Sequence, residues 1–168
     1  MFGKKENFRL DKLREGFTLK LKNTVYKIIE IGEYDWNGDG RSIEYIIKSK
    51  DNNEQAFLEV EFFKGDFEIY FSKAVFVDIE ILKDALKTQE IVFQGHQFFL
   101  EEHYKGAYKN LTNRASWKSL SSYMFFNNKR KNLTIEHWED NTYEVFYGEK
   151  IKTKNIKNIT PKPLNERI

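Results

Sequence analysis

The alternation of apolar and polar residues over short segments constrains the fold of this 168-residue chain more than any other feature. In segment 58–63, Leu58, Val60 and Phe62 alternate with glutamates, and segment 67–71 alternates in the same way after a short polar turn. A two-residue period is typical of a β-strand with one buried face, and two such strands around a turn predict a hairpin. The other expected strands, rich in aromatic and β-branched residues, are 17–21, 25–34, 43–49, 92–103, 122–127, 133–138 and 143–148. We therefore predict an all-β fold.

One helix is expected, at 78–87, because Ile79, Leu82 and Leu86 fall on one face at helical spacing. A membrane-spanning helix needs about 20 apolar residues. No segment without Asp, Glu, Lys or Arg is longer than ten residues in this sequence. We expect the helix to be a connector between β-structures.

The second half of the chain repeats the first. Segment 58–63 aligns with 133–138, and 67–75 aligns with 143–151, with the same class of residue at nearly every position. We therefore expect a duplicated antiparallel meander, in which two small barrel-like or SH3-like units of about five strands pack together, because so small a unit is marginally stable alone. The expected divisions are a first repeat, a connector, a second repeat and a basic tail, at 1–77, 78–90, 91–152 and 153–168.

The turn of the first hairpin predicts its register. A two-residue turn at 65–66 places Phe63 opposite Glu68 and Glu61 opposite Tyr70. These four side chains then share one face, and the opposite face is entirely apolar. We predict that the apolar face belongs to the core.

The second hairpin is expected to present the same pattern. A three-residue turn at 140–142 places Trp138 opposite Glu144 and Glu136 opposite Phe146. We call the eight residues of the two hairpins the Glu–aromatic set: Glu61, Phe63, Glu68, Tyr70, Glu136, Trp138, Glu144 and Phe146. One interpretation is a half-exposed sheet face that glutamates keep hydrated. The other is a surface that recognises a cation, since carboxylates and aromatic ring faces both attract ammonium and guanidinium groups.

Composition excludes several classes of site. The chain has no cysteine, which excludes disulfides, thiolate metal ligands and cysteine nucleophiles. The three histidines have no zinc-site spacing, and there is no glycine-rich phosphate loop. Segment 35–40 resembles the start of a calcium loop but lacks its later glutamate, so we predict a hairpin connection there. We expect no catalytic residue, no metal and no cofactor, and a protein that is not an enzyme.

Charge is distributed unevenly along the chain. Segments 1–20 and 149–168 carry +3 and +4, and the remaining residues, 21–148, carry −5. Tyr104, Tyr108 and Trp117 lie among lysines and an arginine, which is the interleaving of a surface that stacks nucleic-acid bases. A groove for single-stranded nucleic acid is normally basic, so the acidic body argues against that interpretation.

Segment 13–19 and the strand after it, 25–28, resemble the start of the bacterial Domain of Unknown Function 4178 family. Segments 93–102 and 133–138, with Glu144 and 147–149, resemble the second half of that family, so the resemblance covers roughly residues 8–156. The family has no established activity and no catalytic residues to transfer. Its genomic association with membrane-stress proteins and aminopropyl-transferase-like enzymes implies an envelope-associated or polyamine-linked role.

These observations predict a cytoplasmic, non-enzymatic bacterial β-module. We expect it to bind another protein, including one in a membrane-associated complex, through the Glu–aromatic set. Two alternatives remain open. One is single-stranded nucleic-acid binding through Tyr104, Tyr108 and Trp117, and the other is binding of a small cation or polyamine.

Overall fold

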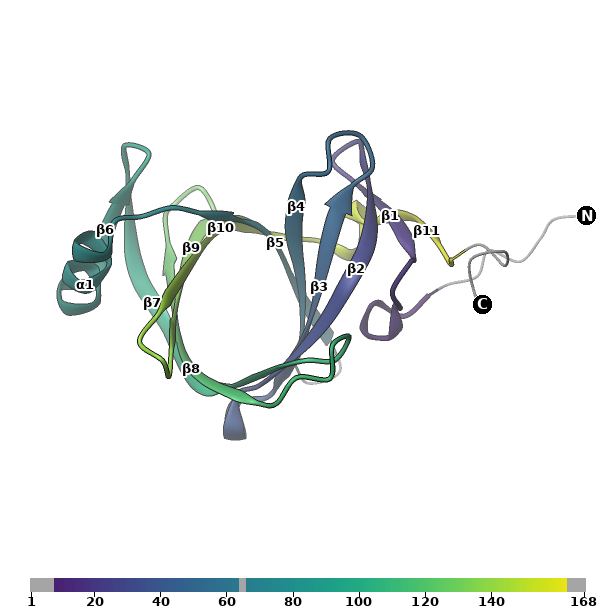
Figure 1. Cartoon of the computed structure of the whole chain (residues 1–168). Helices are drawn as coiled ribbons and strands as arrows, with labels where there is room; N and C mark the ends of the chain where they lie inside the picture. The colour runs from purple at the N-terminus through teal and green to yellow at the C-terminus, as the bar shows by residue number, and fades with distance from the viewer. Residues whose placement is uncertain (1–7, 64–65, 163–168) are drawn as a thin grey trace, which may run out of the picture.

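The computed structural model describes residues 8–63 and 66–162, and within these the chain forms one antiparallel sheet and one α-helix (Figure 1). The predicted all-β fold is confirmed. The strands are β1 (Thr18–Leu21), β2 (Thr24–Asp35), β3 (Arg41–Ser49), β4 (Gln55–Phe63), β5 (Asp66–Val75), β6 (Glu90–Phe93), β7 (His96–Asn110), β8 (Lys118–Phe126), β9 (Lys131–Trp138), β10 (Tyr143–Ile151) and β11 (Lys157–Thr160). The helix is α1 (Ile79–Thr88), and short 3₁₀ turns lie at Leu10–Lys12, Asn37–Asp39 and Thr153–Asn155.

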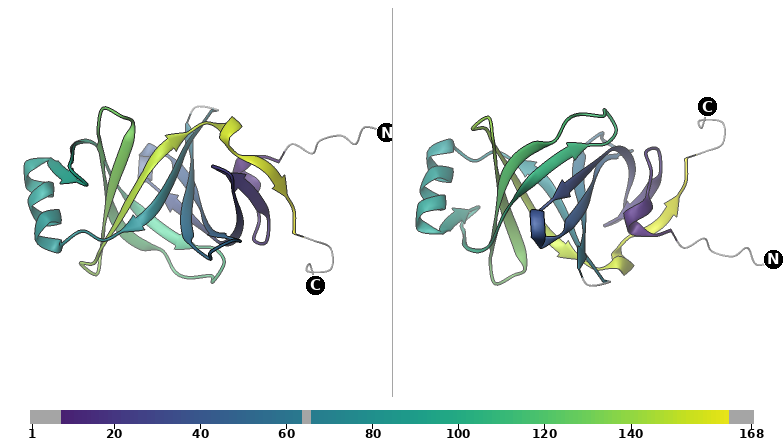
Figure 2. Two further views of the ribbon diagram at one scale, coloured as in Figure 1. Left: turned by 90° about the horizontal axis from the view of Figure 1, so that it is seen from above. Right: turned by 90° about the horizontal axis from the view of Figure 1, so that it is seen from below.

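Strands β2–β5 and β7–β10 curl into a ring. The sheet order is β11-β1-β2-β3-β4-β5-β10-β9-β8-β7-β6, and β2 also pairs with β7. That additional pairing joins residues 32–35 to 107–110 and closes the ring, whose opening faces the viewer in Figure 1. Strands β1 and β11 extend the sheet on one side of the ring, and β6 with α1 lies on the other side (Figure 2).

Each half of the chain contributes four strands to this ring. The halves meet at two places, where β5 pairs with β10 and where β2 pairs with β7. In the structure the two halves therefore form one ring together instead of two separate small barrels. The reason is that each meander leaves strand edges unpaired, and the edges of one half satisfy those of the other.

The apolar cores lie on the outer faces of the ring. The first core packs the outer face of β2–β5 against β1, β11 and the N-terminal segment, and it contains Leu19, Tyr45, Leu58, Ile69 and Ile156. The second packs the outer face of β8–β10 against α1 and β6, and it contains Leu82, Phe98, Phe125, Leu133 and Ile135. The apolar face predicted for the first hairpin is in the first core, through Leu58, Val60, Ile69 and Phe71. The other face of each ring strand is consequently left to line the interior.

The predicted helix is confirmed one residue later than expected, at Ile79–Thr88. The Asp78 side chain caps it by accepting a hydrogen bond from the Glu80 N–H at 2.9 Å. Leu82 and Ala85 are buried against the second core, whereas Ile79 is 47% exposed. No helix in the described part of the chain has the length and apolar character needed to cross a membrane.

The register predicted for the first hairpin is wrong by two residues. Phe63 pairs with Asp66, Glu61 with Glu68, and Glu59 with Tyr70. The turn therefore falls at 64–65, which lies outside the described residues, and not at 65–66. Because the shift is an even number of residues, every side chain keeps its predicted face.

The second hairpin is shifted from its prediction by the same amount. Glu136 pairs with Glu144, and the Trp138 N–H donates to the Thr142 carbonyl at 2.9 Å. The loop is thus 139–141, because Asn141 takes the left-handed conformation that closes a three-residue hairpin loop, with φ of 66°. In both hairpins the correct register places two glutamates directly opposite each other.

Closure of the ring depends on a glycine in β7. A Cβ at Gly106 would lie 2.2 Å from the Asp35 carbonyl oxygen and 2.9 Å from the Trp36 ring. Contacts this short require the backbone of β2 to move away from β7. By contrast, a Cβ at Gly38, in the turn that follows β2, would meet nothing within 4 Å.

We predict that Gly106→Ala destabilises the protein by about 1–3 kcal/mol, the usual cost of forcing an atom into a packed region. Gly38→Ala is the matched control and should change the free energy of unfolding by less than about 0.5 kcal/mol. Urea unfolding followed by tryptophan fluorescence measures both. Equal stability of the two variants would show that the β2–β7 contact is looser than described.

Candidate functional site

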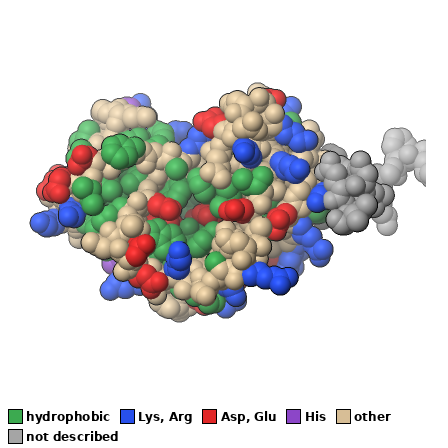
Figure 3. Space-filling view, viewed as in Figure 1, with side chains coloured by type: hydrophobic (Ala, Val, Ile, Leu, Met, Phe, Trp, Pro, Cys, Tyr) green, Lys and Arg blue, Asp and Glu red, His purple; other side chains and the backbone are tan. Residues whose placement is uncertain are grey.

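The interior of the ring is lined by glutamates and aromatic side chains. The view along the ring shows acidic side chains set in a hollow among apolar ones (Figure 3). Two cavities lie in this interior. The β4–β5 turn is at one end of the ring and the β9–β10 turn is at the other, because β5 and β10 are antiparallel. We call the cavity at the β9–β10 end the first cavity and the cavity at the β4–β5 end the second cavity.

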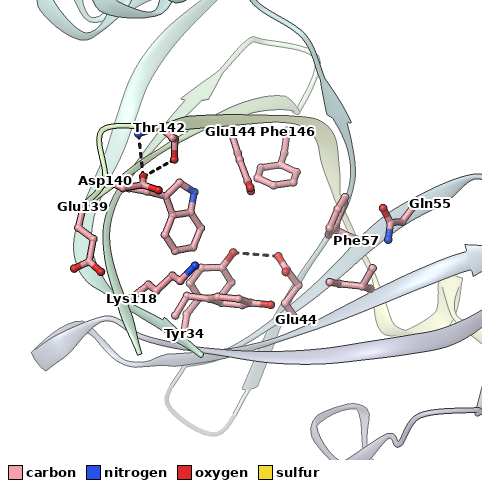
Figure 4. Close-up of a pocket in the computed structure, with 13 residues that line it drawn as sticks. Tyr34, Glu44, Gln55, Phe57, Lys118, Glu139, Asp140, Thr142, Glu144 and Phe146 are labelled. Atoms are coloured by element: carbon pink, nitrogen blue, oxygen red, sulfur yellow. Dashed lines mark hydrogen bonds between the residues drawn. The ribbon is translucent and has the colours of Figure 1, made fainter. Parts of the chain in front are cut away.

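The first cavity has a volume of about 490 Å³. Glu44 and Glu144 approach it from opposite strands, and Phe57 and Phe146 form one wall, with their ring centroids 4.9 Å apart (Figure 4). Lys118 also lines this cavity. This volume is in the range of small-molecule sites in proteins.

The second cavity has a volume of about 230 Å³ and is the more acidic of the two. Its lining includes the glutamates Glu59, Glu61, Glu68, Glu102 and Glu136. Trp36 and Tyr104 supply aromatic walls. Arg41 lies at its edge, where the guanidinium group is paired with Glu33 at 3.2 Å and with Asp35 at 3.5 Å. Lys150 is paired with Glu68 at 2.8 Å.

Tyr34 lies between the two cavities, and no described residue lines both of them. Its hydroxyl lies 2.8 Å from Glu136 Oε1 and 3.2 Å from Glu44 Oε2, and all three side chains are buried. One hydroxyl carries one hydrogen, so it can donate to only one of the two carboxylates at a time. Glu136 is 4% exposed, and its other oxygen, Oε2, has no hydrogen-bond partner among the described residues.

Aromatic rings form a continuous track from one cavity to the other. Tyr34 stacks on Trp36 with a centroid distance of 4.8 Å and an interplanar angle of 7°. Tyr104 contacts Trp36 at 6.0 Å on the second-cavity side, and Tyr108 contacts Tyr34 at 4.8 Å on the other. Trp138 then contacts Tyr108 at 5.8 Å. We call these five residues the aromatic track.

Burial raises the pKa of the interior glutamates Glu44, Glu59, Glu61 and Glu136, and neighbouring carboxylates raise the pKa of Glu44, Glu61 and Glu136 further. The pKa of Glu44 is raised to about 8 by burial and then by Glu59, and that of Glu61 to about 9 by burial, Glu59 and Glu102. Burial raises the pKa of Glu59 to about 6, and burial with Glu44 raises that of Glu136 well above its usual range. No ion pair of Glu44, Glu59 or Glu136 occurs in the described part of the chain. The interior therefore has more acid groups than it has cations to balance them.

The described side chains of the Glu–aromatic set face the ring interior, and Glu144 is the exposed one among them. Trp138, Glu144 and Phe146 line the first cavity. Glu61, Glu68 and Glu136 line the second cavity, and the Tyr70 hydroxyl lies 3.4 Å from Glu68. The Phe63 side chain is outside the described part of the structure.

Among the interior residues that sequence reasoning missed are Tyr34, Trp36, Glu44, Glu59 and Glu102. The same alternation marks them, because Glu44 and Glu59 each adjoin buried core residues, Tyr45 and Leu58. Their significance depends on which strands face each other across the ring, and alternation within one strand carries no such information.

The aromatic residues proposed for base stacking are not brought together on one surface. Tyr104 and Tyr108 face the ring interior, at the second and first cavity respectively. Trp117 is 42% exposed and lies 5.9 Å from the Lys109 ammonium group, on the opposite face of β7. Lys118 lies with Tyr108 at the first cavity, but Lys109 lies on the other face of β7, so these basic and aromatic side chains do not share one groove.

Protonation of these carboxyl groups predicts a pH-dependent stability. Their pKa values are higher in the folded chain, at about 6 to 9, than the ordinary value of 4.5, so the folded state binds more protons between these limits. The free energy of unfolding must then fall as pH rises from about 5 to 9. We expect the urea midpoint to decrease over this range; urea is used because guanidinium is itself an organic cation.

The variant Glu136→Gln removes one of these groups while keeping an acceptor for Tyr34. It should match the wild type near pH 5 and exceed it by about 1 kcal/mol or more at pH 8. Glu101→Gln, which changes an exposed glutamate on β7, is the control and should show no such divergence. A urea midpoint that rises with pH, or parallel curves for Glu136→Gln and wild type, would contradict this account.

Comparison with known proteins gives one result. A family model with the description "Domain of unknown function (DUF4178)" matches residues 14–153, which include every strand of the ring. No curated protein and no solved structure matches the chain.

Proposed function

The chain belongs to the DUF4178 family, whose description assigns no activity, and we propose from the site that it binds an organic cation inside the ring. The observation that carries this proposal is the Glu136 carboxylate, which is 4% exposed and has an oxygen without a partner. It faces an interior that holds further carboxyl groups and where no described lysine or arginine pairs with Glu44, Glu59 or Glu136.

A buried carboxylate without a counterion is costly, so the interior glutamates that are buried, Glu44 and Glu136, must either hold a proton or meet a cation. Tyr34 supplies a single hydrogen to two of them. A protonated amine brings three N–H donors and a positive charge, which is what the free Glu136 oxygen and its neighbours lack. The faces of Trp36, Tyr34 and Tyr108 would add cation–π attraction in a region shielded from water.

The arrangement favours an organic cation over a metal ion. The carboxyl groups are spread along the interior, and within the described residues no three His, Asp or Glu side chains converge as metal ligands. The walls between them are aromatic rings, which suit the carbon skeleton of an amine.

The position of the glutamates inside the ring also limits how a protein or a nucleic acid could bind to them. A protein would reach the Glu–aromatic set only by inserting a side chain such as lysine or arginine into one of the cavities. Nucleic acid would meet an acidic interior, which repels phosphate. A small cation is therefore the ligand that the site supports best.

We predict that n-butylamine binds the purified chain at pH 8, measured by isothermal titration calorimetry, and that 1-butanol, its neutral counterpart, does not. Glu136→Gln should weaken amine binding at least about tenfold, because a desolvated charge pair is worth about 1.4 kcal/mol or more. Glu101→Gln should bind as the wild type does. If no amine binds, or if Glu136→Gln binds with unchanged affinity, the proposal is wrong.

The affinity for the amine should also rise with pH. Since the interior carboxyl groups have raised pKa values, they hold protons at pH 6 that a cation must displace, and fewer at pH 9. Titrations in buffers of different ionisation enthalpy should therefore show proton release on binding, greatest at the lower pH. Binding that is independent of both pH and buffer would mean that the amine does not meet these groups.

A further inference from the structure

Resting on the proposed function, we infer which organic cation the first cavity binds: a quaternary ammonium group, in which the charged nitrogen carries methyl groups and no N–H. The alternative is a primary ammonium group, which carries three N–H donors. The choice depends on what the first cavity lacks, which is a positive charge, hydrogen-bond donors or both.

The buried end of the first cavity has no cation of its own. Glu44 is 7% exposed, and no lysine or arginine in the described part of the chain forms an ion pair with it. Lys118 lines the same cavity, but it is exposed, and its positive charge favours the ionised forms of the exposed Asp140 and Glu144. None of the groups that act most strongly on the pKa of Glu44 is a cation. The mouth of the cavity is therefore balanced in part by Lys118, whereas its buried end is not.

Hydrogen-bond donors are not what the first cavity lacks. At the second cavity, the buried polar atom without a partner is an acceptor, Glu136 Oε2. Among the described residues that line the first cavity, the one such atom is a donor, the Trp138 indole N–H. Glu44 also has a donor within reach, because the Tyr34 hydroxyl lies 3.2 Å from its Oε2. The first cavity therefore calls for positive charge without further N–H groups, since an N–H left unpaired away from water costs free energy.

Aromatic rings line the first cavity on several sides. Five lining residues are aromatic, and each belongs to a different strand of the ring: Tyr34 of β2, Phe57 of β4, Tyr108 of β7, Trp138 of β9 and Phe146 of β10. Phe57 and Phe146 meet edge to face, with an interplanar angle of 75°. Tyr108 contacts both Tyr34 and Trp138. Because β4 and β10 flank β5, while β2 and β7 pair where the ring closes, these two groups of aromatic side chains approach the cavity from opposite sides.

The aromatic side chains and Glu44 face a common space. In Figure 4, Tyr34 and Glu44 lie on one side of the cavity, Glu144 and Phe146 lie on the opposite side, and Phe57 lies between them. The volume of about 490 Å³ is large enough for a trimethylammonium group on a short chain. Methyl groups on a charged nitrogen pack on aromatic faces, and a cage of aromatic rings is the usual site for quaternary ammonium ligands. A primary ammonium is more strongly hydrated and would have to exchange its water for three acceptors.

The test is isothermal titration calorimetry at pH 8 with three compounds of matched skeleton. Choline carries a trimethylammonium group, ethanolamine carries a primary ammonium group in its place, and 3,3-dimethyl-1-butanol is the neutral isostere of choline. Each is titrated into the chain in the presence of enough n-butylamine to saturate the site at Glu136, so that binding at the first cavity is measured. We expect one choline per chain, bound at least about tenfold more tightly than ethanolamine, because choline has no N–H to satisfy and gains several ring contacts. The neutral isostere should not bind.

Variants locate choline within the ring. Phe57→Leu removes one aromatic ring but keeps an apolar side chain, and it should weaken choline binding at least about fivefold while leaving n-butylamine binding unchanged. Glu44→Gln removes the buried charge and should weaken choline binding at least about tenfold. Trp117→Leu is the matched control, because it removes a ring that is 42% exposed and lines neither cavity. It should bind choline as the wild type does.

The outcomes separate this inference from the proposed function. If n-butylamine binds through Glu136 but choline does not bind, or binds no more tightly than ethanolamine, the quaternary cation is excluded and the organic-cation proposal stands. If choline binds equally well to Phe57→Leu and Trp117→Leu, the first cavity is not its site and the inference is wrong. If neither n-butylamine nor choline binds, both proposals fall. The comparison of choline with ethanolamine on the wild-type chain decides the case if a variant fails to fold.

Discussion

One tyrosine hydroxyl contacts two buried carboxyl groups, and this contact determines where the molecule must obtain its stability. Tyr34 can donate to Glu44 or to Glu136 but not to both, and Glu136 keeps a free oxygen in a region that water reaches poorly. Such an arrangement costs free energy unless a proton or a cation joins it. The fold must therefore obtain its stability elsewhere, and the two apolar cores outside the ring provide it.

The ring and its cores follow from one alternating pattern. Leu58 and Val60 face the first core, while Glu59 and Glu61, between and beside them, face the interior. The corresponding residues of the other hairpin, Ile135 and Glu136, divide in the same way between the second core and the interior. The glutamates thus lie inside the ring beside the aromatic track, and the two larger apolar cores lie outside it, where α1, β1, β6 and β11 cover them (Figure 2).

Much of this was predictable from sequence, and the failures have a common physical cause. Alternation within a strand identified the core face of Leu58 and Val60 correctly, and the helical spacing of apolar residues located the helix. Hairpin register was missed because a shift of two residues leaves every face unchanged, so burial cannot reveal it. Ring closure was missed because it pairs Tyr34 with Tyr108, far apart in the chain, and local patterns say nothing about such pairs. For the same reason, the Glu–aromatic set was interpreted as a half-exposed sheet face although its described members face the ring interior.

Separation of the interior from the cores has an evolutionary consequence. In most small domains the residues that bind a ligand share their packing with the residues that hold the fold, so a change of ligand endangers folding. Here Glu61 and Glu144 can change while Leu58 and Ile135 remain as they are, on the other side of the same strands. A chain built in this way can diversify what it binds through substitutions that its scaffold tolerates, and homologues with matching outer cores need not share a ligand.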